Sequence, residues 1–218
     1  MARIEESKGR EKGGGYERLF GNSALGSLMS KVHAAVIRSG NELEKLIRSR
    51  VPQIPDLDVF LGNRDMPDGI FMAAKRDVKK SRIIVFSGSD PDFVIFVIRG
   101  NQKICYVIEL KDGDTFDTKK AAGERESMRT FVDAQHISFQ IDSYFCCFNQ
   151  ISKDEIFDGF KRKIPKSELM TGQELCNLLE LDYEEIRAER KSDQKPNFRY
   201  FMRELLKVEE VRRFLGRH

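Results

Sequence analysis

Two apolar runs joined by a tight-turn signal constrain this chain more than any other feature. Residues 93–98 and 104–108 are apolar or aromatic throughout, and Gly100-Asn101 lies between them. Glycine and asparagine both tolerate the positive φ that a two-residue hairpin turn requires. The sequence therefore predicts an antiparallel β-hairpin with these two residues as its loop.

The hairpin register brings acidic and basic side chains together at its open end. Asp92 falls opposite Glu109, and side chains of directly opposed residues share one face about 5 Å apart at Cβ. Lys111 follows Glu109 by two residues, so it lies on the same face. Two such carboxylates repel unless a cation lies between them, and Mg²⁺ takes one or two protein carboxylates. The sequence thus predicts a magnesium site, with Asp92 and Glu109 as ligands.

A metal ion held there has a chemical use. Bound metal polarises a phosphodiester oxygen and lowers the pKa of a water molecule. A lysine beside the metal orients or deprotonates that water and offsets negative charge in the transition state. Two alternatives stay open. The polar residues only terminate the strands, or Asp90, which the same register places opposite Lys111, replaces Asp92.

The dipeptide Pro91-Asp92 and residues 109–111 (Glu-Leu-Lys) resemble the PD-(D/E)xK signature of many restriction endonucleases. The resemblance extends from residue 82 to about 124. It implies an α/β (α+β) fold, in which a central mixed β-sheet flanked by helices forms a restriction-endonuclease-like core. It also implies a Mg²⁺-dependent type II restriction enzyme that cuts double-stranded DNA at a specific sequence.

Members of the resembled family often add a glutamate from the first helix to the metal site. Helical periodicity begins near residue 22 and continues to Ile47, with a weak point or a break at Gly40. Glu42 and Glu44 flank its apolar stripe on opposite sides, so at most one of them faces a given site. Glu44 follows an apolar residue, as the family's acid tends to, and is preferred over Glu42. Surface ion pairing is the competing interpretation.

The remaining apolar patterns predict a sheet with helices on both faces. Residues 83–86 are expected to form the first strand of a three-strand meander with the hairpin, and residues 59–61 a short strand or turn. A crossover helix is expected to place a strand at 137–148 beside the hairpin. Predicted helices lie at about 119–133 (with Thr118 as N-cap), 155–160, 175–179, 183–191 and 198–215.

Length and composition indicate one domain with a short appendage. Residues 1–20 are polar and predict a flexible N-terminal arm, and residues 21–218 a single nuclease domain. Its core is expected at about 21–165 and its helical C-terminal part at about 168–218. No apolar run approaches the length of a membrane span. The four cysteines lack zinc-like spacing, which favours buried reduced thiols in a cytoplasmic protein. The resemblance to restriction endonucleases implies a prokaryotic one.

Basic residues matter here by position, because a net charge of +3 does not by itself indicate a nucleic-acid binder. Solvated surface is the simpler interpretation of the basic clusters. Beside a nuclease site, however, two of them become candidates for contacts to DNA phosphates. These candidates are Lys119, Lys120, Lys161, Arg162 and Lys163. The basic segment 75–82, before the first expected strand, is either a solvated connection or a phosphate-contacting loop beside the site.

Cutting both strands at once requires two sites, so a homodimer matched to a palindromic DNA site is expected. A junction resolvase or repair nuclease of the same fold is the competing enzyme. The second hypothesis is a non-catalytic DNA-binding protein that uses residues 173–191 as a helix-turn-helix. Glu184 and Glu185 would oppose phosphates in that role. Asp117 and Glu124 are candidates for the rim of the site and are not among its expected catalytic or metal-binding residues.

Overall fold

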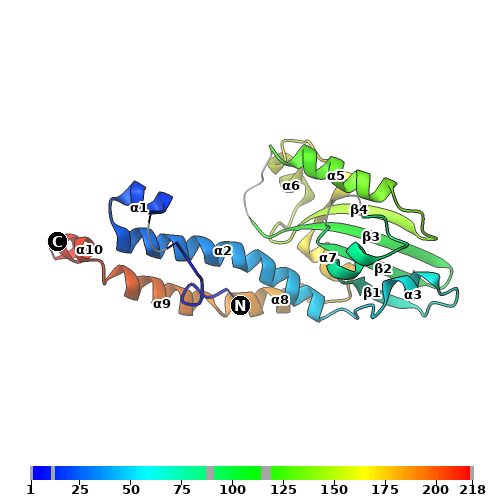
Figure 1. Ribbon diagram of the computed structural model, residues 1–218, viewed down its shortest axis with the longest axis horizontal. Coiled ribbons are helices and arrows are strands. Elements are labelled where there is room, and N and C mark those ends of the chain that lie inside the picture. The colour runs from blue at the N-terminus through cyan, green and yellow to red at the C-terminus, as the bar shows by residue number, and fades with distance from the viewer. Residues whose placement is uncertain (1, 11–12, 87–90, 114–118, 217–218) are drawn as a thin grey trace. The chain divides into compact units, whose positions relative to one another are not determined.

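The computed structural model describes residues 2–10, 13–86, 91–113 and 119–216. The chain divides into two compact units, which Figure 1 shows by residue colour. The helical unit comprises Met1–Lys45 and Glu184–His218, and the sheet unit comprises Leu46–Tyr183. The candidate site belongs to the sheet unit.

The sheet unit is built on a five-stranded sheet in the order β1-β2-β3-β4-β5. β1, β2 and β3 are antiparallel neighbours, whereas β4 and β5 join in parallel. This mixed sheet with flanking helices confirms the predicted fold class. The strands are β1 (Gly69–Ala73), β2 (Phe93–Arg99), β3 (Gln102–Lys111), β4 (Gln140–Cys147) and β5 (Leu169–Thr171).

The predicted hairpin is present in the predicted register. Phe93 pairs with Ile108 and Arg99 pairs with Gln102, which leaves Gly100 and Asn101 as the loop. Gly100 has φ of 58°, in the left-handed region that a tight hairpin turn requires. The local turn chemistry therefore fixes which residues meet at the other end of the hairpin.

The prediction of a first strand at 83–86 is wrong, because β1 takes the place beside β2. Ile84 is buried, as its apolar character suggests, but it does not pair with a strand. The backbone of Val85 is hydrogen-bonded on both sides by one side chain: its N–H donates to Gln135 Oε1 and its carbonyl accepts from Gln135 Nε2. That amide satisfies the polar groups that would otherwise need a strand neighbour.

Residues 59–61 form neither a strand nor an isolated turn, because they lie within α3 (Leu57–Gly62). The side chain of Asp56 accepts a hydrogen bond from the N–H of Val59 and caps this helix. A capped single turn of helix is compatible with the burial of Leu57, which joins the core.

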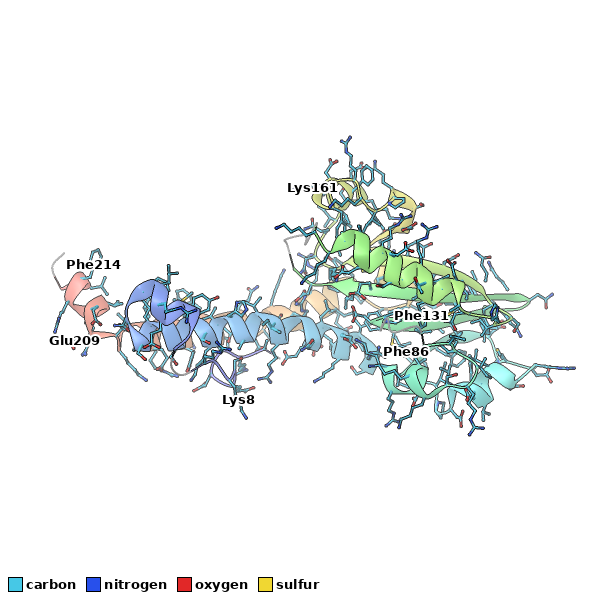
Figure 2. All side chains as sticks on the ribbon, turned by 45° about the horizontal axis from the view of Figure 1, so that its top comes forward. Lys8, Phe86, Phe131, Lys161, Glu209 and Phe214 are labelled. Carbon is cyan, nitrogen blue, oxygen red and sulfur yellow. The ribbon has the colours of Figure 1, made fainter. Side chains whose placement is uncertain are left out.

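Helices of the sheet unit cover the face on which the candidate site lies. Phe131 of α5, labelled in Figure 2, is buried in the core with Val94 and Phe96 of β2. The chain crosses through α5 from β3 to the parallel strand β4, as predicted. Thr118, the predicted N-cap of this helix, lies outside the described residues. The helices are α4 (Lys75–Lys80), α5 (Ala121–Asp133), α6 (Lys153–Gly159), η1 (Lys166–Glu168) and α7 (Gly172–Leu178).

The helical unit contains a long helix that runs through the predicted weak point at Gly40 without a break. The predicted final helix at 198–215 is instead two helices, which end and begin around Val208. Pro196 does not interrupt the first of them, because it lies in the first turn, where its missing N–H costs nothing. The helices are α1 (Gly15–Phe20), α2 (Ser23–Ser49), α8 (Tyr183–Lys191), α9 (Gln194–Leu205) and α10 (Glu209–Leu215). The last residues of α2, from Leu46, and the first residue of α8, Tyr183, belong to the sheet unit.

The N-terminal segment has contacts within the helical unit. Arg3 Nε donates to Asp193 Oδ1 at 3.0 Å, and the N–H of Ile4 donates to Asn197 Oδ1 at 2.9 Å. Throughout the described ranges, no helix combines the length and the apolar character needed to cross a membrane.

The four cysteines are buried free thiols, and their chemistry gives the first prediction. Burial raises the pKa of the Cys147 and Cys176 thiols to about 12. Because the thiolate is the reactive form, the native protein should react very slowly with Ellman's reagent at pH 8. The same protein unfolded in guanidinium should react rapidly at all four thiols. Fast stoichiometric reaction of the native protein would contradict this burial.

Candidate active site

The hairpin brings its acidic and basic residues together where β2 begins and β3 ends. Asp92 immediately precedes β2, and its Oδ2 accepts a hydrogen bond from the N–H of Leu110 at 2.8 Å. Glu109 and Lys111 flank Leu110 on β3, so both point to the face opposite to that of Leu110. Asp90, the alternative to Asp92, lies outside the described residues. The structure therefore places the three predicted residues at one end of the sheet.

The charge of Asp92 acts on Glu109. Burial raises the pKa of the Glu109 carboxyl, and the negative charge of Asp92 raises it further. The ammonium of Lys111 offsets only part of this effect. A bound cation would offset the repulsion between the two carboxylates and lower this raised pKa.

Lys111 lies between two carboxylates. Its Nζ donates to Glu109 Oε1 at 2.9 Å and to Glu124 Oε1 at 3.0 Å. Burial acts to lower the pKa of Lys111, but the two carboxylates outweigh it, so the pKa lies above its usual value. Lys111 is therefore an ammonium at neutral pH, suited to orienting a water or offsetting negative charge rather than to removing a proton.

Glu124 is closer to the site than the sequence suggests. It lies in the first turn of α5, and its ion pair with Lys111 makes it a direct neighbour of the predicted lysine. The sequence signal for this contact is the position of Glu124 at the start of the first helix after the Glu-Leu-Lys tripeptide. Asp117, the other rim candidate, lies outside the described residues.

Two basic residues from elsewhere in the sheet unit contact Asp92. Lys75 belongs to the basic segment 75–82, for which a phosphate-contacting loop was one interpretation, whereas Arg48 was not predicted near the site. Lys75 Nζ lies 2.9 Å from Asp92 Oδ1. The guanidinium of Arg48 donates to the carbonyl oxygens of Ala73, at 3.0 Å, and of Asp92. It also lies over the ring of Phe93, 5.1 Å from the centroid. Arg48 thus joins the end of β1 to the start of β2.

The donor atoms fit Mg²⁺ better than a softer metal. Asp92 and Glu109 offer carboxylate oxygens, which suit a hard cation that keeps several waters. No group of three or more His, Cys, Asp and Glu side chains arranged to hold a metal occurs among the described residues. A cage made wholly of protein ligands is therefore absent from that part of the chain, whereas a pair of carboxylates is present.

The other predicted residues belong to other segments of the chain. Glu42 and Glu44 belong to the helical unit, where Glu42 forms an ion pair with Arg38 at 2.9 Å. The phosphate-contact candidates are exposed, and Figure 2 labels one of them, Lys161. They are Lys119, Lys120, Lys161, Arg162 and Lys163.

The helix pair of the DNA-binding alternative is divided between the two units. The capping box that opens α7 is present, with Thr171 and Glu174 as its members. α7 belongs to the sheet unit, whereas α8 from Glu184 onwards belongs to the helical unit. Its first turn carries Glu184 and Glu185, as the sequence shows.

Comparison with known proteins gives one full-length relative. The type II restriction enzyme HhaII of Haemophilus parahaemolyticus is 41% identical over 228 residues, and the alignment spans 100% of both chains. No protein-family model and no solved structure matches the chain.

The electrostatics of Glu109 give a second prediction. In the metal-free protein, carbon NMR of the carboxyl groups should show the Glu109 pKa above the ordinary value of a glutamate, about 4.3. The substitution Glu124→Gln removes a nearby negative charge and should lower that pKa. Glu155→Gln, on the exposed surface of α6, should leave it unchanged. A Glu109 pKa at or below the ordinary value would contradict the burial and the repulsion by Asp92.

Proposed function

The chain belongs to the type II restriction enzymes, and we propose that Asp92, Glu109 and Lys111 are the residues with which it hydrolyses phosphodiester bonds of double-stranded DNA. The observation that carries the proposal is the cluster at the end of the hairpin. There an ammonium lies 2.9 Å from one carboxylate, whose pKa is raised by burial and by a second carboxylate. The full-length relationship favours this activity over that of a junction resolvase, a repair nuclease or a non-catalytic DNA-binding protein.

Asp92 and Glu109 would hold Mg²⁺. When bound, Mg²⁺ polarises a phosphodiester oxygen and lowers the pKa of a water molecule. Lys111 orients the attacking water through its Nζ and stabilises the negative charge that develops on the phosphate. Glu124 positions Lys111 from the opposite side. Hydrolysis breaks one P–O bond and leaves one end with a phosphate and the other with a hydroxyl.

Glu44 is proposed to assist the site as a further carboxylate. It is preferred over Glu42, which forms an ion pair with Arg38, because it follows the apolar residue Leu43. Both side chains are half-buried, so exposure does not distinguish them.

Exposed basic residues around the sheet unit are proposed to contact DNA phosphates. Their positions immediately before α5 and immediately after α6 support this role, because both segments are exposed. Arg162 already forms an ion pair with Asp158 at 3.1 Å, which a phosphate would have to replace. The proposed residues are Lys119, Lys120, Lys161, Arg162 and Lys163.

The enzyme is proposed to act as a homodimer that joins two copies through the helical unit. Phe198, Met202 and Leu206 follow one another at four-residue intervals along α9 and its C-cap, and all three are exposed. The exposed fraction of Phe198 is 66%, unusual for a phenylalanine on a helix. Such a stripe is typical of a helix that packs against a partner.

Symmetry favours a second copy as that partner. In a two-fold pair the same surface of each copy meets the other, so an antiparallel pairing about Met202 buries the stripe of both copies at once.

The domain organisation and the location of the enzyme are proposed as follows. Residues 21–218 work as one nuclease, with residues 1–20 as an N-terminal arm. The four buried free thiols favour the reducing cytoplasm of a prokaryotic cell.

Cleavage of plasmid DNA tests the catalytic residues. With Mg²⁺ the wild type should give discrete bands, and EDTA should abolish them. Asp92→Ala and Lys111→Ala should each slow cleavage by about a thousandfold, because the first removes a metal ligand and the second removes a cation that stabilises the transition state. Asp65→Ala and Lys80→Met, at exposed positions, should cut like the wild type. Unchanged bands with either active-site variant would overturn the assignment.

Sedimentation tests the dimer. The wild type should sediment with twice the chain mass of 25.2 kDa. The double substitution Phe198→Glu and Met202→Glu places like charges in the proposed stripe and should yield monomers. Val59→Glu, at an exposed apolar position of the sheet unit, should remain dimeric. A monomeric wild type, or a double variant that still dimerises, would contradict the proposed interface.

A further inference from the structure

We propose that Lys75 is a second functional lysine of the active site, which neutralises Asp92 in the metal-free enzyme and contacts a DNA phosphate once metal is bound. This inference rests on the proposed catalytic role of Asp92. It adds a residue that lies outside the Pro-Asp and Glu-Leu-Lys segments, 17 positions before Asp92 in the chain.

The sheet brings Lys75 to this place. β1 and β2 are antiparallel, and their last recorded pair at this end is Ala73 with Val94. Continuing the register by two positions places Lys75 opposite Asp92. The chain turns into α4 at Lys75, yet the side chain still reaches Asp92, with Nζ 2.9 Å from Oδ1. Asp92 therefore has Lys75, just beyond β1, on one side and Glu109 of β3 on the other.

Arg48 holds the backbone on both sides of this contact. Its guanidinium bonds the carbonyl of Ala73, two residues before Lys75, and the carbonyl of Asp92 itself. The ion pair is also partly shielded from water, with exposed fractions of 33% for the Lys75 side chain and 20% for that of Asp92. Because the backbone near Lys75 and the backbone of its partner Asp92 are both held, the position of the Lys75 side chain is better defined than that of a freely rotating surface lysine.

The charges of the cluster indicate that Lys75 would exchange Asp92 for a DNA phosphate when a metal ion binds. In the metal-free state Asp92 is paired with Lys75, and Glu109 is paired with Lys111. A divalent cation held by both carboxylates competes with both ammonium groups for the same oxygens. The site then carries a net excess of positive charge beside the metal, which suits phosphate oxygens. Lys75 would meet the phosphate from the β1 side and Lys111 from the β3 side.

Metal affinity and cleavage should respond to Lys75→Met in opposite directions. Without DNA, Mn²⁺ titrations followed by electron paramagnetic resonance should show about fivefold tighter binding, because a competing cation has gone. Single-turnover cleavage at saturating Mg²⁺ should be about a hundredfold slower, because a phosphate contact is lost. Lys75→Arg should retain most of the cleavage rate. Lys80→Met, on the exposed surface of the same helix, should change neither quantity.

Each result has a definite meaning. Unchanged or weaker Mn²⁺ binding by Lys75→Met would overturn the neutralising role. Tighter Mn²⁺ binding with a wild-type cleavage rate would overturn the phosphate contact. Circular dichroism checks the fold, and Lys75→Gln replaces the methionine variant if that variant unfolds. Asp92→Ala separates the two proposals: if it still binds Mn²⁺ and cuts DNA, the catalytic site itself is wrong, whatever Lys75 does.

Discussion

The active site depends on the register of the hairpin between β2 and β3. Antiparallel pairing about Gly100 and Asn101 decides that Asp92 meets the end of β3 where Glu109 and Lys111 project to one face. A slip of one residue would turn every side chain of one strand to the opposite face and separate the carboxylates. The β1–β2 pairing adds a second register of the same kind, which supplies Lys75. Two local pairings therefore set the positions of four charged groups at one end of the sheet.

The second constraint is electrostatic. Asp92, Glu109 and Glu124 are three acidic groups in a partly buried place, and burial penalises unpaired charge. Lys75 and Lys111 reduce that cost, and the N–H of Leu110 satisfies one oxygen of Asp92. The raised pKa of Glu109 shows that the compensation is incomplete. The lysines thus keep the carboxylates together without a metal ion. The repulsion that remains between the carboxylates favours the binding of a cation.

Sequence reasoning reached the parts of the site that local chemistry determines. The hairpin loop, the positions of Asp92, Glu109 and Lys111 and the crossover to β4 all follow from turn residues and strand periodicity. The first strand was misplaced because residues 83–86 have the apolar character of a strand, whereas the side chain of Gln135 satisfies the backbone of Val85. Those hydrogen bonds join residues 50 positions apart, and no local sequence pattern predicts them.

The contacts that Lys75, Arg48 and Glu124 make in the site escaped prediction for the same physical reason. Each residue lies in a segment whose composition is ordinary for exposed helix or loop, and each gains its role from a contact made across the sheet unit. A local motif therefore names the residues that do the chemistry, whereas tertiary packing selects the residues that hold and balance them. Here Arg48 and Lys75 hold Asp92, and Glu124 holds Lys111. A lysine paired with each carboxylate of the site brings positive charge to the place that a phosphate must approach.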